Sequence, residues 1–342
     1  MNRPRLVNGT APGEPMRVTP LAEIQMRSVK WLERPLWQGS AFQLLAGQKG
    51  AGKGTYLAGL AARVSRGGSN VLFVSSEDST EIDLKPRLVA AGAEIDRCGV
   101  IQQHVRLPDD VDNLYDLATG MGGVGLMVVD PLANHIGLHD SNSDGDVRNA
   151  IAPLNRLADE LDCLLVGVRH PGKDRSRGAV ASILGSTAWV DTPRAVVMIA
   201  PDDLDPQVRH IQVVAGNRSL NGSAQAFRIE PVDVPGLDEP ITRAVELGES
   251  SKSVDELLEL RKVSDTKSGK ARELLLDILD EEGAQESDAL DAHVAREIGL
   301  AARTVRDIRK TLSQEGLIRA APQKDEHGEI QRWHVRRTAA PR

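Results

Sequence analysis

A glycine-rich segment has the residue types and spacing of a phosphate-binding loop: Gly47, Gln48, Lys49, Gly50, Ala51, Gly52, Lys53, Gly54 and Thr55. Phosphate oxygens bind backbone N–H groups, so side chains must not block the chain's approach, which explains the glycines. The positive end of the following helix favours an anion, and Lys53 supplies a mobile charge for the β- and γ-phosphates. We expect this loop to bind ATP. A glycine-rich turn without a ligand is the alternative.

One position departs from the usual loop pattern. The Ser or Thr that normally follows the lysine is Gly54 here, and Thr55 comes next. Adenylate kinases resemble the chain at this point, with Gly-Lys-Gly-Thr in the same place. We expect Mg²⁺ at the site with Thr55 as a candidate ligand, and the hydroxyl that reaches the metal stays open.

Polar residues follow three of the buried strands that the sequence predicts. Asp130 ends the apolar run 126–129, where a carboxylate would hold Mg²⁺; a strand-end turn is the alternative. Glu77 follows strand 71–75 and is predicted to be the base that activates water, whereas Asp78 could instead cap the next helix. His170 follows strand 163–168 and is predicted to sense the γ-phosphate, with a plain surface turn as the alternative.

The elements that would position these residues alternate along the chain. Short apolar runs at 42–46, 71–75, 126–129, 163–168, 195–199 and 210–214 indicate buried strands. Amphipathic segments such as 55–66 and 147–161 indicate helices between them. This alternation predicts an α/β fold with a largely parallel sheet and helices on its faces.

Length and composition bound the organisation of the chain. Its 342 residues suggest about two domains, and the net charge of -7 leaves room only for a local nucleic-acid-binding face. We predict a flexible arm (1–25), an ATPase domain (26–235), a linker (236–268) and a small C-terminal domain (269–340). Cys98 and Cys163 are expected to be buried thiols in a reducing compartment. Without a signal peptide or an apolar membrane span in the sequence, we expect a cytoplasmic protein.

The C-terminal pattern resembles a winged helix-turn-helix domain. Helices are predicted at 270–281, 287–298 and 300–314, followed by two strands around a turn at 324–328. Residues 301–342 carry ten basic residues against five acids, which favours duplex DNA as partner over another protein. The residues expected to contact DNA lie on the third helix: Arg303, Thr304, Arg306 and Lys310.

The whole set of motifs resembles the RepA-type branch of RecA-like hexameric ATPases over residues 30 to 232. The residues that carry this resemblance are the phosphate loop, 76–78, 86–88, 91–93, 128–132, 146–148, His170, 185–188 and Asp191 with Arg194. The resemblance implies a RecA-like P-loop core that forms a ring, with six subunits expected, ATP at the subunit interfaces and single-stranded DNA as a partner. It also implies that Glu77 is the base and Asp130 the Mg²⁺ ligand. Arg194 and Arg218 are candidate arginine fingers, for which a surface salt bridge is the alternative.

Three functions remain open from the sequence. The first is an ATP-driven DNA motor that resembles a replicative helicase. The second is a RecA- or RadA-like recombination or repair ATPase. The third is a DNA-binding regulator in which ATP acts as a switch.

Overall fold

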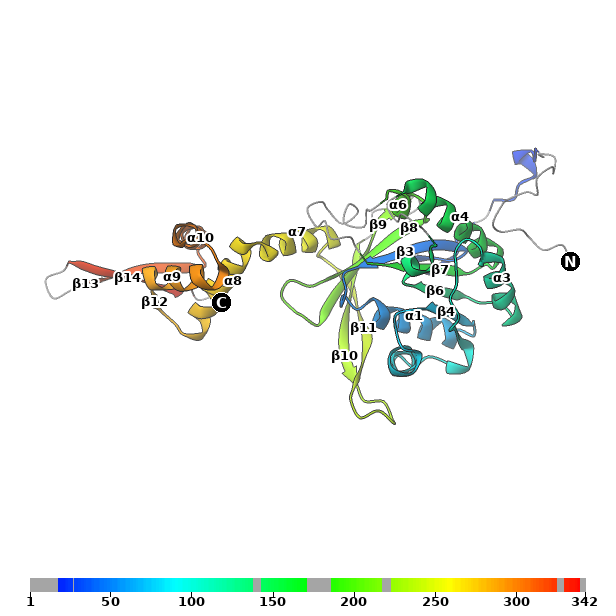
Figure 1. Cartoon of the computed structure of the whole chain (residues 1–342), viewed down its shortest axis with the longest axis horizontal. Coiled ribbons are helices and arrows are strands. Elements are labelled where there is room, and N and C mark those ends of the chain that lie inside the picture. Colours follow the sequence, from blue (N-terminus) through cyan, green and yellow to red (C-terminus); the bar gives the residue numbers. More distant parts are fainter. Residues whose placement is uncertain are drawn as a thin grey trace. The chain divides into compact units, whose positions relative to one another are not determined.

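The computed structural model describes residues 18–26, 28–137, 143–170, 186–216, 223–324 and 329–338 (Figure 1). The chain divides into two compact units, Met1–Leu258 and Glu259–Arg342. Among the described residues no helix is both long enough and apolar enough to cross a membrane.

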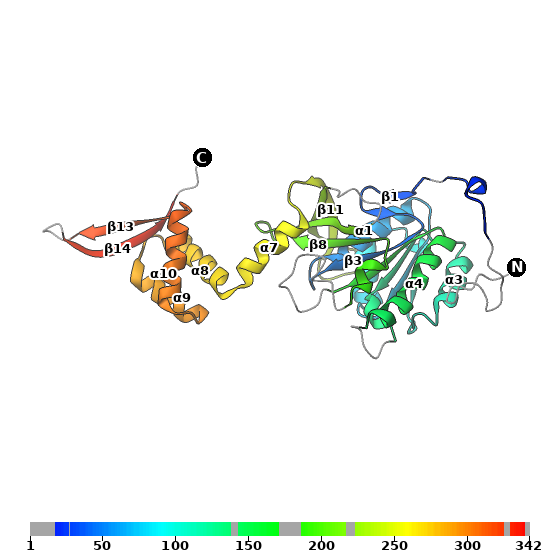
Figure 2. The ribbon, with the colours of Figure 1, turned by 90° about the horizontal axis from the view of Figure 1, so that it is seen from above.

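A large sheet forms the centre of the first unit (Figure 2). It has nine strands, in the order β11-β10-β9-β8-β3-β7-β6-β4-β5. The pairings from β8 to β5 are parallel, and those from β8 to β11 are antiparallel. The predicted α/β fold with a mostly parallel sheet is therefore confirmed. The strands are β3 (Ala41–Gly47), β4 (Val71–Ser75), β5 (Cys98–Ile101), β6 (Leu126–Asp130), β7 (Leu164–Arg169), β8 (Ala195–Pro201), β9 (Val208–Gly216), β10 (Ala224–Val232) and β11 (Ile241–Ser250).

Helices cover both faces of this sheet, because its inner strands are apolar on both sides. Successive residues of β3 show this: Leu44 packs in the core under α3 and α4, and Leu45 packs in the core under α1 and α2. The described α-helices of this unit are α1 (Lys53–Arg66), α2 (Lys85–Ala90), α3 (Val111–Gly120), α4 (Asp144–Glu160) and α6 (Ala188–Asp191). A further helix, α7 (Val254–Asp265), begins in this unit and continues past its last residue, Leu258. Shorter elements are β1 (Trp31–Glu33), β2 (Trp37–Gln38), η1 (Leu21–Glu23), η2 (Thr80–Leu84), η3 (Ile95–Arg97) and η4 (Leu132–His135).

The prediction of a linker at 236–268 is wrong for much of its length. Residues 241–250 form β11, which pairs along its whole length with β10. Val254, Leu257 and Leu258 of α7 are then buried in the main core. The sequence missed β11 because it is an edge strand whose side chains are mostly exposed or half-buried, so it lacks a clear alternation of apolar residues. Cys163 is buried as predicted, whereas Cys98 is only half-buried.

The second unit contains three helices and a small sheet. The helices are α8 (Lys267–Glu281), α9 (Ser287–Ile298) and α10 (Ala302–Gln314), and the sheet has the order β12-β14-β13. Its strands are β12 (Gln285–Glu286), β13 (Ile318–Lys324) and β14 (Ile330–Arg337). Leu275, Val294, Val305, Leu312 and Val335 form the centre of its core. Three helices followed by two antiparallel strands are thus present as predicted, whereas residues 325–328 of the predicted turn lie outside the described residues.

Candidate functional site: a nucleotide-binding edge of the sheet

The glycine-rich loop joins the end of β3 to the first residue of α1, Lys53. Gly50 and Gly52 have φ angles of 78° and 87°, in the left-handed region that glycine adopts without strain. A Cβ at Gly52 would also come within 2.6 Å of Cδ1 of Ile229 on β10. These glycines are needed both for the backbone path and for the close approach of a neighbouring strand.

Lys53 is held inside the loop. Its Nζ donates hydrogen bonds to the carbonyl oxygens of Gly47 (2.8 Å) and Gln48 (3.0 Å) and lies 3.1 Å from Nδ1 of His170. Its residue surface is only 6% exposed, and this burial lowers the pKa of Lys53 to about 8, against the attraction of Asp130 and Glu77. The ammonium group remains charged at neutral pH, as a phosphate ligand requires.

The predicted polar residues at the strand ends converge on the loop. Because β3, β7, β6 and β4 are adjacent and parallel, their carboxyl ends meet at one edge of the sheet. Glu77, Asp130, His170 and the loop line the same cavity, of about 620 Å³. His170 lies between Lys53 and Glu77, with its Nε2 3.6 Å from Oε2 of Glu77. Burial and the nearby ammonium of Lys53 lower the pKa of His170, so the imidazole is neutral at neutral pH.

Asp130 has the electrostatic surroundings of a cation ligand. Burial, and secondly the nearby carboxylate of Asp78, raise its pKa to about 6 against the opposing charges of Lys53 and Arg87. A bound divalent cation would relieve this unfavourable charge. Among the described residues, no group of three or more His, Cys, Asp and Glu side chains is placed to hold a metal. The single largely buried carboxylate of Asp130 beside the phosphate loop fits Mg²⁺, which usually takes only one or two carboxylates and completes its shell with water and substrate phosphates.

An ion pair explains the unusual Gly54. The guanidinium of Arg87 pairs with Asp78 through Nη1, and its Nη2 lies 3.1 Å from Oδ1 of Asp83. A Cβ at Gly54 would lie 3.1 Å from Nη1 of Arg87. A Ser or Thr side chain at this position would press against the guanidinium, which would have to shift by a few tenths of an ångström. Sequence reasoning did not assign Arg87 to the site, although the segment 86–88 was part of the resemblance.

The suggestion that Asp78 caps a helix is wrong. Ser79 is the N-cap residue of η2, and its side chain accepts a hydrogen bond from the backbone N–H of Ile82 (3.2 Å). Asp78 is instead engaged by Arg87 and lines the nucleotide cavity. Ser79 is a sufficient cap because its hydroxyl oxygen is an acceptor for an otherwise unpaired N–H group.

Thr55 faces the antiparallel side of the sheet. Its Oγ1 lies 3.0 Å from Oγ1 of Thr242 on β11. Both hydroxyl groups line the nucleotide cavity, together with Arg209 and Ile229. The strand missed in the sequence therefore supplies one wall of the site.

The two candidate arginine fingers differ in what the structure describes. Arg194 is exposed and directly precedes β8, in which Ala195 is opposite Gln43 and Ile199 is opposite Gly47. Arg194 therefore lies at the amino end of the parallel strands, whereas the loop leaves their carboxyl end. The two ends are about 13 Å apart at a strand rise of about 3.3 Å per residue. Arg218 lies outside the described residues.

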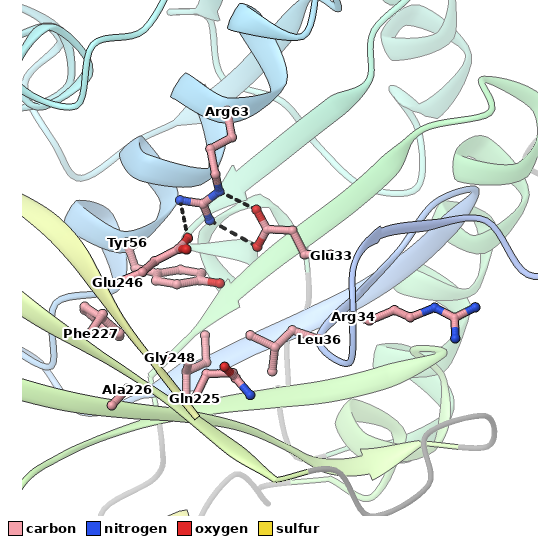
Figure 3. A pocket seen from close by; sticks show the side chains of 11 residues that line it. Glu33, Arg34, Leu36, Tyr56, Arg63, Gln225, Ala226, Phe227, Glu246 and Gly248 are labelled. Atoms are coloured by element: carbon pink, nitrogen blue, oxygen red, sulfur yellow. Dashed lines mark hydrogen bonds and ion pairs between the residues drawn. The ribbon is translucent and has the colours of Figure 1, made fainter. Parts of the chain in front are cut away.

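A second cavity, of about 290 Å³, lies beside α1 and is lined also by residues of β1, β9, β10 and β11 (Figure 3). Arg63 forms ion pairs there with Glu33 of β1 and with Glu246 of β11, the latter at 3.0 Å. Tyr56 packs against Phe227 with 5.1 Å between the ring centroids. The charges in this cavity are paired with one another. We therefore interpret the cavity as a structural contact that holds α1, and with it the loop, against β1, β10 and β11.

Of the basic residues predicted to contact DNA, some already form ion pairs with acids of the same unit. Arg306 lies 3.1 Å from Oδ1 of Asp288 and 3.7 Å from Oδ2 of Asp291, and Lys310 lies 3.8 Å from Asp307. Arg303 and Thr304 are exposed. The predicted face of α10 thus exists, but acids of the same unit partly neutralise it.

Part of the first unit matches a known protein family. Residues 14–176 match the model of a family described as an AAA domain. No curated protein matches the chain.

Three solved structures are similar to part of the chain. An ATPase domain is 13% identical, with a TM-score of 0.47 over 55% of this chain and 81% of that one. A DnaB-like replicative helicase, solved in a study of its interactions with primase, is also 13% identical with a TM-score of 0.47, over 55% of each chain. The RadB recombinase is 15% identical, with a TM-score of 0.43 over 57% of this chain and 89% of that one. The first unit has the α/β fold of a P-loop NTPase, and its phosphate loop lies within the matched residues.

Proposed function

We propose that this protein hydrolyses ATP to drive movement on DNA, as a motor of the RepA type. The observation that supports this most strongly is the convergence of Lys53, Glu77, Asp130 and His170 at one edge of the sheet, around one cavity. Phosphoryl transfer to water requires a phosphate loop with an ammonium group, a carboxylate that holds Mg²⁺ and a second carboxylate that acts as the base.

Each side chain has a role that follows from its position. The loop amides and Lys53 bind the phosphates of ATP, and Glu77 accepts the proton of the attacking water. Asp130 would hold Mg²⁺, with Thr55 as a further candidate ligand, and the metal would neutralise phosphate charge. His170, between Lys53 and Glu77, is placed to couple the phosphate side of the site to the base.

We further propose that the protein works as a ring, with six subunits expected. Arg194 is exposed and lies at the end of its own strand that is remote from the loop. A role for its charge in hydrolysis therefore requires the site of a neighbouring subunit. In this arrangement single-stranded DNA passes through the ring in the cytoplasm, and the winged-helix-like second unit binds duplex DNA; Arg218 remains a second candidate finger.

The first experiment is ATP hydrolysis by the purified chain, alone and with single-stranded or duplex DNA. Lys53→Ala should abolish turnover, whereas Lys85→Ala, at an exposed lysine outside the loop, should leave it unchanged. Turnover at the wild-type rate in Lys53→Ala would overturn the site assignment.

The same assay separates the proposed motor from the two other functions. Stimulation by single strands together with ATP-driven strand separation supports the motor, and strand exchange without separation would indicate a recombinase. Slow turnover that DNA does not change would indicate a regulator.

A further inference from the structure

The outer face of the β13–β14 hairpin carries several arginines. Residues alternate between the two faces of a strand, and Ile318 and Val335 point into the core of the second unit. The residues that alternate with these on each strand therefore lie on the opposite face, away from the helices. They are Arg319, Ala321 and Gln323 on β13, and Arg332, His334 and Arg336 on β14.

The pairing register brings like charges together on this face. Arg319 is directly opposite Arg336, and Gln323 is opposite Arg332. Like charges directly opposite one another destabilise a strand pair unless a counter-ion lies between them. Within the described part of the chain no ion pair involves these three arginines, and the acid on this face is Glu286 of β12, opposite His334.

Other arginines of the same unit are neutralised by its own acids. The pairs are Arg272 with Glu315, Arg306 with Asp288, Arg309 with Asp291, and Arg337 with Asp280. Arg309 makes two hydrogen bonds of 2.8 Å to Asp291, a residue only 1% exposed. Two of the four basic residues of α10, Arg306 and Arg309, are thus paired with acids of α9. The three arginines of the hairpin face have no such partner among the described residues.

We propose that the hairpin face binds the phosphate backbone of duplex DNA and is the main DNA contact of the second unit. The choice of DNA as ligand rests on the proposed function. Two guanidinium groups that face the same way can bind phosphate oxygens through paired hydrogen bonds. The centres of protein–protein interfaces, in contrast, are apolar and depleted of charge, which argues against an acidic protein as the partner.

The spacing of the arginines also suits a duplex. Arg332 and Arg336 are four residues apart on one strand, which separates them by about 13 Å. The major groove of B-form DNA is about 12 Å wide. The two ends of the face can therefore reach phosphates on the two sides of one groove.

The test is binding of a short labelled duplex to the full-length protein by fluorescence anisotropy, over about 50 to 200 mM salt. Each lost phosphate contact lowers the slope of log affinity against log salt by about 0.9. Arg319→Gln with Arg336→Gln should therefore lower the slope by about 1.8 and weaken binding at least tenfold. Arg332→Gln alone should lower it by about 0.9. Both variants should stay folded, because they remove charges without ion-pair partners in the described part of the chain, and circular dichroism checks this.

Two matched variants make the test specific. Lys270→Gln with Arg296→Gln removes the same charge from exposed positions on α8 and α9 and should change the slope little. Arg303→Gln with Lys310→Gln tests α10 directly and should have the smaller effect. An unlabelled single strand of the same length should compete more weakly than the duplex.

The possible failures are distinguishable. If the wild type binds duplex DNA and the hairpin variants bind it equally well, this inference is wrong and the proposed motor stands. An equal loss in the α8–α9 variant, a larger loss in the α10 variant, or stronger competition by the single strand also overturns it. If the wild type binds no duplex at all, this inference is wrong. Whether the proposed motor is also wrong is then decided separately, by whether single-stranded DNA stimulates ATP hydrolysis.

Discussion

Replacing Asp130 with Asn should stabilise the first unit while it abolishes hydrolysis. The pKa of Asp130 rises from 3.8 to about 6, mainly because the carboxylate is buried and secondly because Asp78 is near. A shift of this size corresponds to about 3 kcal/mol against the ionised form at neutral pH. Asp130 keeps partial access to solvent, so we expect a gain of about 1–2 kcal/mol in the free energy of unfolding.

The effect should depend on pH in one direction. The folded state holds the proton of Asp130 more tightly than the unfolded state does, so raising the pH through this interval destabilises the wild type. The loss begins near the unfolded pKa of 3.8 and is complete above the folded pKa of about 6. Asp130→Asn has no such proton. Its free energy of unfolding should therefore exceed that of the wild type by the full amount at pH 7.5 and equal it below about pH 4.

Urea unfolding at several pH values, with ATP hydrolysis measured in parallel, tests this reasoning. A gain of 1–2 kcal/mol corresponds to a rise in Tm of about 2–8 °C for a unit of this size. Asp78→Asn is the matched control and should destabilise instead, because it leaves Arg87 without one of its two carboxylates. If Asp130→Asn were less stable than the wild type at pH 7.5, the conclusion that burial dominates at this carboxylate would be refuted.

Two further variants test the surroundings of the site. Gly54→Ser restores the usual hydroxyl but places a Cβ 3.1 Å from Nη1 of Arg87, so the Arg87–Asp78 pair must move. We expect ATP turnover to fall by about tenfold, equivalent to about 1.4 kcal/mol. Faster turnover than the wild type in a steady-state assay would contradict this. Leu257→Ala should destabilise the first unit by about 2–5 kcal/mol in urea unfolding, because Leu257 is only 1% exposed. Leu260→Ala, at an exposed position on the same helix, should change stability by less than about 0.5 kcal/mol, and equal losses would show that α7 is not packed on the core.

Much of the candidate site could be predicted from short stretches of sequence. The loop needs glycines that tolerate positive φ and a lysine at a fixed offset, and both are local requirements. Strands buried on both faces are continuous apolar runs, so β4 and β6 could be bounded closely, and their ends marked Glu77 and Asp130. The parallel α/β pattern then implied that these ends meet at one edge.

Other features depend on residues that are distant in the sequence, and only the tertiary structure decided them. Gly54 can be understood only with Arg87 beside it, 33 positions later in the chain. Strand β11 was missed because an edge strand needs no apolar alternation, yet its Thr242 meets Thr55. The sequence alone thus determined which residues can bind phosphate, since that chemistry is local, and folding decided which charges are free and which are paired, since pairing depends on three-dimensional neighbours.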